Sequence, residues 1–304
     1  MKSVLLTGAF GFLGKRLLEM LLERGYYVHT ISRAHRYNLK LKNCTNWQAD
    51  LLDSTSYSAI FDLVQTSGLI HLAWESKHGF YWSSPTNLDW LSASLRLIKS
   101  FSEHGGRRVL ISGTSAEYAW GGWAYLNEFI TPTIPDSLYG ASKNALMRVI
   151  EQWAPEIGLS VAWARIFNPF GPGEHEARLL PRIANRLLAG EEISFDQGAE
   201  VRDFLYVDDV CEALICLYES SINGPVNIGS GTGETILSIL SALEDCLGSC
   251  GRITFDFKKT NNVRYPFVVA DTRRLNYDVG WTPRYTLRER LDSACNWWRI
   301  QGTR

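Results

Sequence analysis

The chain has 304 residues, of which 45% are apolar and 21% are charged, an ordinary balance for a globular protein with a large core. The formal net charge is −1, which excludes a global basic field that would attract nucleic acid or a membrane surface. No apolar run reaches the length of about 18 residues that a membrane-spanning helix needs.

Strands and helices alternate in the first half of the chain. Short apolar runs predict strands at residues 4–6, 27–32, 69–73, 109–112 and 160–167, with one more strand before Asp50. Leucines at helical spacing predict a helix that follows the first strand and ends at Gly25, and further helices are expected at 86–104 and 138–154. Because such alternation builds a parallel sheet covered by helices on both faces, we expect this arrangement.

The second half of the chain has a more mixed pattern. Helices are predicted near 180–189, 207–220 and 237–247, and short strands near 193–195 and 253–257. No long linker separates the two halves. We therefore expect a doubly wound sheet with a smaller C-terminal lobe that is intertwined with it.

A glycine-rich segment, Gly8-Ala9-Phe10-Gly11-Phe12-Leu13-Gly14, lies between the first strand and the first helix. Glycines there allow close approach of a pyrophosphate, and the helix N-terminus supplies amide donors and a favourable dipole. The spacing is Gly-x-x-Gly-x-x-Gly and not the more general Gly-x-Gly-x-x-Gly. The segment predicts a Rossmann-type dinucleotide site; the alternative is a tight strand–helix turn without a ligand.

The second strand ends in Ser32-Arg33, and Arg36 follows shortly. A carboxylate is common here when the cofactor has a free ribose 2′-hydroxyl, whereas an arginine suits a 2′-phosphate. The sequence therefore favours NADP(H), with NAD(H) also possible. The alternative for Arg33 is a solvated charge on a loop.

Tyr139 and Lys143 lie four residues apart in a predicted helix, so their side chains share one face. A free tyrosine has a pKa of about 10, which is high for acid–base work at neutral pH. We expect the ammonium group of Lys143, together with an oxidised nicotinamide, to favour the phenolate and lower the pKa of Tyr139.

The order of these motifs resembles the extended short-chain dehydrogenase/reductase family of nucleotide-sugar epimerases, dehydratases and ketoreductases. The resemblance covers nearly the whole chain. It rests on the glycine segment, on Ser112-Gly113-Thr114-Ser115 and on Tyr139-x-x-x-Lys143. It also rests on three later segments: Arg165 to Gly173, Arg202 to Asp209, and Asn227-Ile228-Gly229.

The resemblance implies a role for each matching residue. Tyr139 would be the proton donor or acceptor, Lys143 would orient the nicotinamide ribose, and Thr114 would hold the substrate oxygen, with Ser115 as a second candidate for that role. The cofactor-binding residues would be Gly8, Phe10, Gly11, Phe12, Leu13, Gly14, Ser32, Arg33, Asp50, Leu51, Leu72, Ala73, Trp74, Asn87, Ser112, Tyr139, Lys143, Phe167 and Pro169. The substrate-binding residues would be Thr114, Ser115, Trp74, Tyr81, Asn168, Arg178, Leu180, Arg202 and Arg264.

The resemblance also implies domains and partners. Residues 1–166 would form the dinucleotide-binding Rossmann domain, and residues 167–304 would form mainly the nucleotide-sugar lobe, with some segments returning to the sheet. A homodimer through the helices near 87–104 and 139–154 is expected. Six scattered cysteines without a Cys-x-x-Cys pair, and no signal segment, indicate buried, reduced thiols in a cytoplasmic protein with no metal site.

Departures from the family pattern help to choose a reaction. The family's dehydratases carry an Asp-Glu pair after the catalytic threonine, where this chain has Ser115 and Ala116, so dehydration is disfavoured. Arg33 favours an exchangeable NADPH and a net reduction. The sequence thus predicts reduction of a nucleotide-linked 4-keto-6-deoxy sugar. The stretch from Gly113 to Trp120 resembles deoxysugar synthases of bacterial surface-polysaccharide pathways, which implies a role in making polysaccharides such as O-antigen. An epimerase of the same family and a non-catalytic NADP(H)-sensing regulator remain as alternatives.

Overall fold

A seven-stranded parallel sheet forms the centre of the molecule. The computed structural model describes residues 2–33, 41–195, 198–255 and 265–302. The sheet has the order β11-β6-β5-β4-β1-β2-β3, and every neighbouring pair is parallel. Its strands are β1 (Ser3–Thr7), β2 (Tyr27–Ser32), β3 (Cys44–Gln48), β4 (Gly68–His71), β5 (Arg108–Thr114), β6 (Ser160–Ile166) and β11 (Gly224–Ile228).

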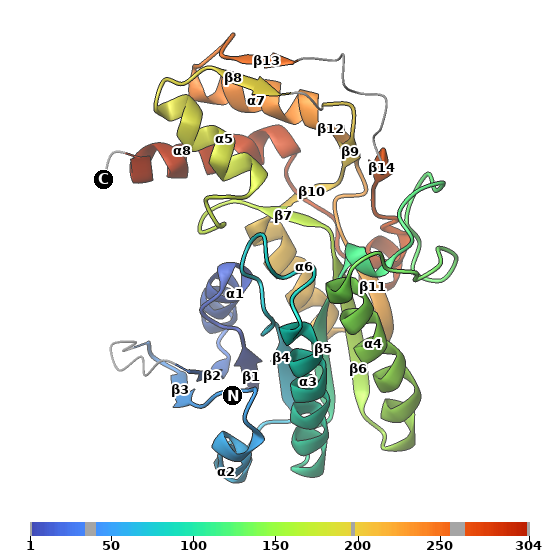
Figure 1. Cartoon of the computed structure of the whole chain (residues 1–304). Helices are drawn as coiled ribbons and strands as arrows, with labels where there is room; N and C mark the ends of the chain where they lie inside the picture. The colour runs from blue at the N-terminus through green and yellow to red at the C-terminus, as the bar shows by residue number, and fades with distance from the viewer. Residues whose placement is uncertain (1, 34–40, 196–197, 256–264, 303–304) are drawn as a thin grey trace.

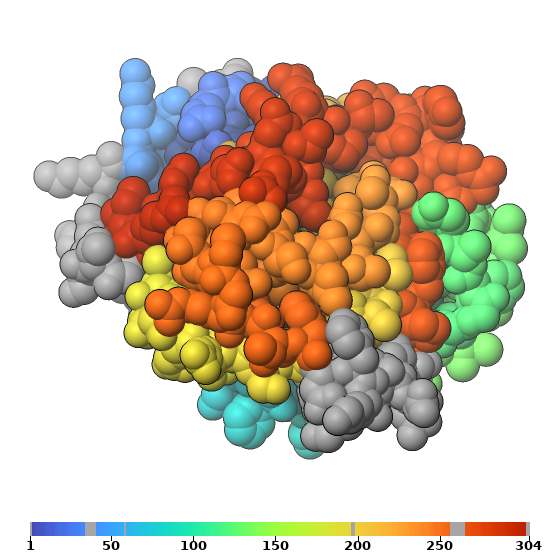
Figure 2. Space-filling model, turned by 90° about the horizontal axis from the view of Figure 1, so that it is seen from above, coloured from blue at the N-terminus to red at the C-terminus, as the bar shows by residue number. Residues whose placement is uncertain are grey.

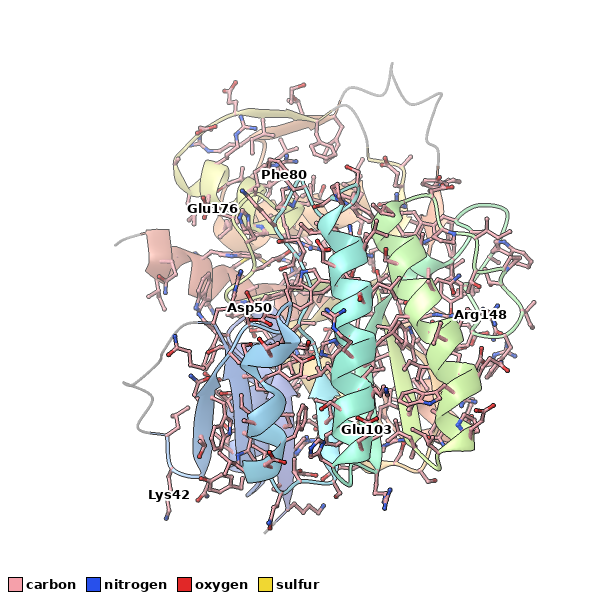
Figure 3. All side chains as sticks on the ribbon, turned by 60° about the horizontal axis from the view of Figure 1, so that its bottom comes forward. Lys42, Asp50, Phe80, Glu103, Arg148 and Glu176 are labelled. Atoms are coloured by element: carbon pink, nitrogen blue, oxygen red, sulfur yellow. The ribbon has the colours of Figure 1, made fainter. Side chains whose placement is uncertain are left out.

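The strand order reverses between β1 and β4, as it does in a doubly wound Rossmann-type sheet. In such sheets ligands bind beyond the carboxyl ends of the strands near this reversal. Asp50 follows β3 at that end of the sheet, whereas Lys42 precedes β3 at the opposite end (Figure 3). The predicted fold class is confirmed.

Helices cover both faces of the sheet because side chains along each strand alternate in direction. On one face, Leu6 of β1 packs in a core with α1 (Phe12–Glu23) and α6 (Val207–Glu219). On the other face, Leu5 packs in a second core with α2 (Ser58–Leu63), α3 (Thr86–Glu103) and α4 (Leu138–Glu156). Figure 1 shows α3 and α4 side by side in front of the sheet.

The C-terminal elements lie over the carboxyl ends of the sheet strands, and seen from above they cover much of the molecule (Figures 1 and 2). The helices are α5 (Leu179–Leu188), α7 (Ile236–Leu247) and α8 (Leu287–Gly302). The strands are β7 (Asn168–Phe170), β8 (Ile193–Phe195), β9 (Val201–Arg202), β10 (Phe204–Tyr206), β12 (Glu234–Thr235), β13 (Ile253–Phe255) and β14 (Phe267–Val268). The chain also has three short helical turns, two in its first half and one in its second half: η1 (Ser54–Ser56), η2 (Ser115–Glu117) and η4 (Arg274–Asp278).

Two elements of the second half, α6 and β11, pack on or pair with the sheet, η4 packs against β11, and most of the others form the upper lobe. The division of the chain at residues 166 and 167 stays a prediction. None of the helices in the described ranges is both long and apolar enough to cross a bilayer.

The six cysteines are free thiols, but only two of them have the burial expected from the sequence, since Cys44, Cys216 and Cys246 are partly exposed. Cys211 and Cys295 are buried, but Cys250 is exposed. Cys250 lies in the turn after α7, between Gly248 and Gly251, where the chain runs over the surface.

Candidate active site

A cavity of about 660 Å³ opens at the carboxyl ends of the sheet strands. Its wall takes residues from the segments that follow β1, β2, β3, β4 and β6, and from the end of β5. This is the place where ligands bind in open parallel sheets. Most of the predicted site residues line it: Gly8, Phe10, Gly11, Phe12, Leu13, Gly14, Ser32, Arg33, Asp50, Leu51, Leu72, Ala73, Trp74, Tyr81, Ser112, Thr114, Ser115, Tyr139, Lys143, Phe167, Asn168, Pro169 and Arg178.

The glycine segment forms a compact turn at one end of the cavity. Gly8 has φ +73°, and a Cβ built on it would lie 2.8 Å from the backbone nitrogen of Ala73. A Cβ on Gly14 would lie 1.9 Å from the carbonyl oxygen of Gly8. Gly11 caps α1 without a side-chain hydrogen bond. The turn therefore presents backbone and a helix N-terminus to the cavity, which fits a dinucleotide pyrophosphate.

The ends of β2 and β3 form the neighbouring wall. The hydroxyl of Ser32 donates to Oδ1 of Asn46 over 3.0 Å, and the exposed Arg33 lines the cavity. The half-buried Asp50 lines it as well and accepts the amide of Leu52 on Oδ1. Arg36 lies outside the described residues.

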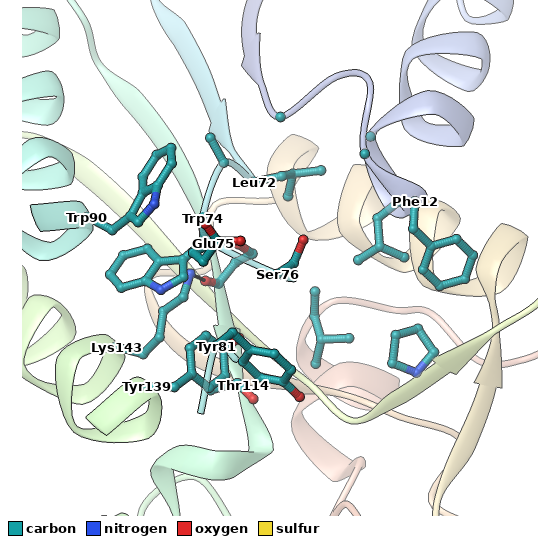
Figure 4. Close-up of a pocket in the computed structure, with 18 of the residues that line it drawn as sticks. Phe12, Leu72, Trp74, Glu75, Ser76, Tyr81, Trp90, Thr114, Tyr139 and Lys143 are labelled. Carbon is teal, nitrogen blue, oxygen red and sulfur yellow. Dashed lines mark hydrogen bonds between the residues drawn. The ribbon is translucent and has the colours of Figure 1, made fainter. Parts of the chain in front are cut away.

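Tyr139, Lys143 and Thr114 meet in the middle of the cavity (Figure 4). The Ser137 hydroxyl accepts the amide of Gly140 and starts α4, so Tyr139 and Lys143 lie one turn apart on the face toward β5. Nζ of Lys143 donates to the carbonyl oxygen of Ser112 over 2.7 Å and lies 4.0 Å from the ring centre of Trp74. The side chain of Thr114 is near enough to Tyr139 to lower the pKa of its phenol.

The pKa of Tyr139 differs from the sequence-based expectation. Burial is the largest influence and raises it above the usual value for a tyrosine, although the nearby Thr114 side chain acts in the opposite direction. The Tyr139 ring lies edge-on to Tyr81 and Trp82, with ring centres 5.0 and 5.9 Å apart, so little water reaches the phenol. Desolvation therefore outweighs nearby cations and holds Tyr139 in its protonated form.

Aromatic rings form the wall around Tyr139. Trp82, Trp90 and Trp120 line the cavity. Nε1 of Trp120 donates to the carbonyl oxygen of Ser115 over 2.7 Å, and its ring makes T-shaped contacts with Trp82 and Tyr265, with ring centres 6.3 and 5.4 Å apart. None of these three tryptophans was among the site residues expected from the sequence. Their only sequence signal is that aromatic residues cluster in the segments after β4 and β5 and in early α3.

Three predicted residues have other positions. Asn87 is fully buried; its Oδ1 accepts Nε1 of Trp74 over 2.8 Å and its Nδ2 donates to the Tyr81 carbonyl over 2.7 Å, so it supports the wall without lining it. Leu180 is buried in the core at the start of α5. Arg202 donates to the carbonyls of Val201 and Tyr265 and is not among the lining residues. Arg264 lies outside the described residues.

Arg178 lines the cavity near its rim and pairs with Glu174, with Nε and Oε1 3.0 Å apart. Burial raises the pKa of Glu174 to about 7. Within the described residues, no three His, Cys, Asp or Glu side chains are grouped to hold a metal ion.

Comparison with known proteins agrees with this geometry. The model of the NAD-dependent epimerase/dehydratase family matches residues 4–229, which contain the glycine turn, Thr114, Tyr139 and Lys143. The chain belongs to this family. The predicted membership of the extended dehydrogenase/reductase group is therefore confirmed, and the protein is of the nucleotide-sugar epimerase/dehydratase kind.

Members of the family resemble the chain along nearly its whole length. The UDP-glucuronic acid decarboxylase 1 of Xenopus tropicalis is 24% identical over 319 residues, covering 98% of this chain and 72% of the relative. A solved UDP-N-acetylglucosamine 4-epimerase of Methanobrevibacter ruminantium M1, in complex with UDP-N-acetylmuramic acid, is 25% identical with a TM-score of 0.88 and 99% of both chains covered. MoeE5 in complex with UDP-glucuronic acid and NAD is 27% identical with a TM-score of 0.83, covering 98% of this chain and 99% of that one.

The buried lysine of this family member gives a pH-dependent contribution to stability. Burial lowers the pKa of Lys143 to about 7, whereas a lysine in the unfolded chain has a pKa of about 10.4. The folded protein therefore binds this proton less tightly than the unfolded chain does. Between these two values the unfolded chain holds one more proton, and the free energy of unfolding therefore rises with pH.

Lys143→Met is expected to remove this rise and to increase the melting temperature of the cofactor-free protein at pH 6–7. The measurement is the melting temperature of both proteins from about pH 6 to about pH 10. Parallel curves for the two proteins would mean that Lys143 does not carry the effect.

Proposed function

We propose that the protein reduces a nucleotide-linked 4-keto-6-deoxy sugar with NADPH, with Tyr139 as the proton donor. The observation that carries this proposal is the position of Tyr139, which lines the cavity together with Thr114 and lies one helical turn from Lys143, while burial of its phenol raises its pKa. Reduction of a ketone leaves a negative oxygen that needs a proton, and a tyrosine that stays protonated at neutral pH can supply it.

Thr114, Tyr139 and Lys143 have different roles in the proposed reduction. A bound NADPH would supply the hydride to the ketone carbon. The hydroxyls of Thr114 and Tyr139 hold the ketone oxygen, and their hydrogen bonds strengthen as negative charge develops on it. The Tyr139 proton moves to that oxygen. The ammonium group of Lys143, one helical turn away, stabilises the phenolate that remains and is positioned to hold the nicotinamide ribose.

Two features support the substrate class. The relatives and solved structures named above act on or bind UDP-linked sugars. The walls beside Tyr139 are the rings of Tyr81, Trp82 and Trp120, which suit the apolar face and methyl group of a 6-deoxy sugar.

The positions after Thr114 carry Ser115 and Ala116, so the acid pair of a dehydratase is missing there.

The preference for NADP(H) rests on Arg33, which is exposed at the cavity wall after β2. A guanidinium can bind a 2′-phosphate through two parallel hydrogen bonds. Arg33→Ala is expected to raise the Kd of NADPH about tenfold, which corresponds to about 1.4 kcal/mol, and to leave that of NADH within about twofold. Titration of the protein with both cofactors measures this. Equal changes for both would make Arg33 an ordinary loop charge and favour NAD, which the MoeE5 complex contains.

An epimerase is the second candidate, because the solved structure from Methanobrevibacter ruminantium M1 is a UDP-N-acetylglucosamine 4-epimerase. The two reactions differ in cofactor balance. A reductase consumes one NADPH for each sugar converted, whereas an epimerase oxidises and then reduces the same sugar without net consumption.

The deciding experiment follows nicotinamide absorbance and sugar composition together, with a panel of nucleotide-linked 4-keto and 4-hydroxy sugars and with NADPH and NADH. Loss of absorbance that matches product formation supports the reductase. Interconversion of sugars at constant absorbance supports the epimerase. Cofactor binding without turnover of any sugar would favour the sensing regulator.

A homodimer through α3 and α4 and a cytoplasmic location stay predictions. The helices α3 and α4 pack beside each other and leave Leu88 and Val149 about half exposed, which supports a partner surface there. A role in deoxysugar synthesis for surface polysaccharides depends on the sugar that the experiment identifies.

A further inference from the structure

We propose that Glu117 is a positioning residue for Thr114: its buried carboxylate, paired with Arg165, fixes the backbone of Thr114 so that the threonine hydroxyl donates toward the reacting oxygen. This inference rests on the proposed function, in which Thr114 and Tyr139 hold that oxygen. Glu117 does not line the cavity and lies behind the reacting groups.

The carboxylate of Glu117 binds three donors in the protein interior. Oε1 accepts the backbone amide of Thr114 over 2.8 Å and Nε1 of Trp163 over 2.9 Å. Oε2 accepts Nε of Arg165 over 2.8 Å. The side chains of Glu117 and Arg165 are 0% and 2% exposed. Thr114 is therefore attached to a rigid, dry ion pair and not to a mobile loop.

Gly113 makes this close approach possible. A Cβ at this position would lie 2.6 Å from Oε1 of Glu117 and 2.1 Å from Nε1 of Trp163. The missing side chain leaves the space in which the carboxylate reaches the amide of Thr114. Gly113, Glu117 and Trp163 thus pack together at the end of β5 and hold its last residue in place.

The same turn orients the hydroxyl group of Thr114. Its oxygen accepts the backbone amide of Ala116 over 3.2 Å, while the Glu117 side chain accepts the Thr114 amide, which together form a capping box on η2. Because the oxygen already accepts a bond from behind, its own proton is left to donate toward Tyr139 and the cavity. Loss of Glu117 would release one side of this box and widen the range of hydroxyl orientations.

Stability alone gives a weak reason for such a pair. Two buried charges are often replaced by apolar side chains without loss of stability, because desolvation offsets their attraction. Arg165 needs further support from Tyr118, whose hydroxyl accepts Nη1 over 3.0 Å and whose ring centre lies 4.6 Å from the guanidinium carbon. The placement of this arrangement directly under Thr114 points to a role in the reaction.

The negative charge of Glu117 also acts on the two other central groups. It raises the pKa of Tyr139 and the pKa of Lys143. It therefore favours the protonated phenol that donates and the charged ammonium that stabilises the resulting phenolate.

The test uses the double variant Glu117→Leu/Arg165→Met, which removes both charges together and leaves neither unpaired. We expect a folded protein whose kcat is about 10- to 100-fold lower, with KM for the sugar and Kd for the cofactor within about twofold. The pH at which activity declines on the alkaline side is expected to fall, because Tyr139 loses a neighbouring negative charge. Unchanged kcat and pH profile in the folded variant would overturn the proposal.

A matched control removes another ion pair away from the cavity. Asp209→Leu/Arg290→Met deletes the pair between α6 and α8, in which Arg290 Nε and Asp209 Oδ2 are 2.7 Å apart. It is expected to leave kcat unchanged. Should the first double variant fail to fold, Glu117→Gln keeps the side-chain volume and is expected to change kcat and the pH profile in the same direction.

Thr114→Val and the double variant Glu117→Leu/Arg165→Met together form a double-mutant cycle. This cycle distinguishes failure of this inference from failure of the proposed function. If Glu117 acts through Thr114, adding Thr114→Val to the double variant lowers kcat little below that of Thr114→Val alone. If the two losses of kcat instead multiply as independent effects, Glu117 does not act on the reaction through Thr114. Full activity of Thr114→Val by itself would instead overturn the role of Thr114 in the proposed function. Taking kcat from sugar conversion makes the test valid for an epimerase as well.

Discussion

Tyr139→Phe is expected to lower kcat about 10²- to 10⁴-fold, the range that a positioned general acid contributes. The phenylalanine ring keeps the edge-on contacts with Tyr81 and Trp82, so the fold and the cavity are retained. The variant loses only the hydroxyl that binds the ketone oxygen and supplies its proton. The measurement is kcat and KM for the nucleotide sugar, together with the Kd of the cofactor, which is expected to stay within about twofold.

Tyr26→Phe is a matched control. Its hydroxyl donates to Glu219 over 2.6 Å just before β2, at the end of the sheet opposite the cavity, so the same atom is lost without effect on the reaction. We expect this variant to keep the kcat of the parent. If Tyr139→Phe also converted sugar at the parental rate, the assignment of Tyr139 as proton donor would be wrong, whichever net reaction the protein performs.

Much of the fold was predictable because its signals are local. A strand, a glycine turn and an amphipathic helix follow one another within the first 23 residues, and the same strand–helix order recurs up to β6. The pairing of β11 with β6 was not predictable in detail, since it joins Gly224 to Ala162 across the second half of the chain. Which C-terminal segments return to the sheet depends on such long-range packing.

The centre of the site was predictable for a similar reason. Helical periodicity brings Tyr139 and Lys143 to one face, and Thr114 ends a sheet strand, so two local rules bring them together. The direction of the Tyr139 pKa shift was not predictable, because it depends on burial by the distant rings of Tyr81 and Trp82.

Side-chain direction explains the remaining differences. The position of Asn87 matches the family pattern, but its amide turns inward to hold Trp74 and Tyr81. The pair between Glu117 and Arg165 joins residues 48 positions apart, and no spacing rule connects them. Such contacts follow only once the strands β5 and β6 lie side by side.

Gly14→Ala is expected to weaken cofactor binding about 100-fold and to lower the melting temperature by several degrees. The new Cβ would lie 1.9 Å from the carbonyl oxygen of Gly8 and 2.7 Å from its carbonyl carbon, so backbone and not a flexible side chain must move. Overpacking of this kind costs about 1–3 kcal/mol, and about 2.7 kcal/mol corresponds to 100-fold in affinity. Cofactor titration and thermal unfolding measure the two effects.

Gly11→Ala separates the packing of the turn from its contact with the ligand. A Cβ there would lie 3.4 Å from the Gly8 carbonyl oxygen, an ordinary contact, so the melting temperature is expected to stay near that of the parent. Cofactor affinity should still fall, because the added methyl group stands at the N-terminus of α1 where a pyrophosphate approaches most closely. Undiminished affinity in both variants would show that the dinucleotide does not bind at this turn, and the site would have to lie elsewhere in the cavity.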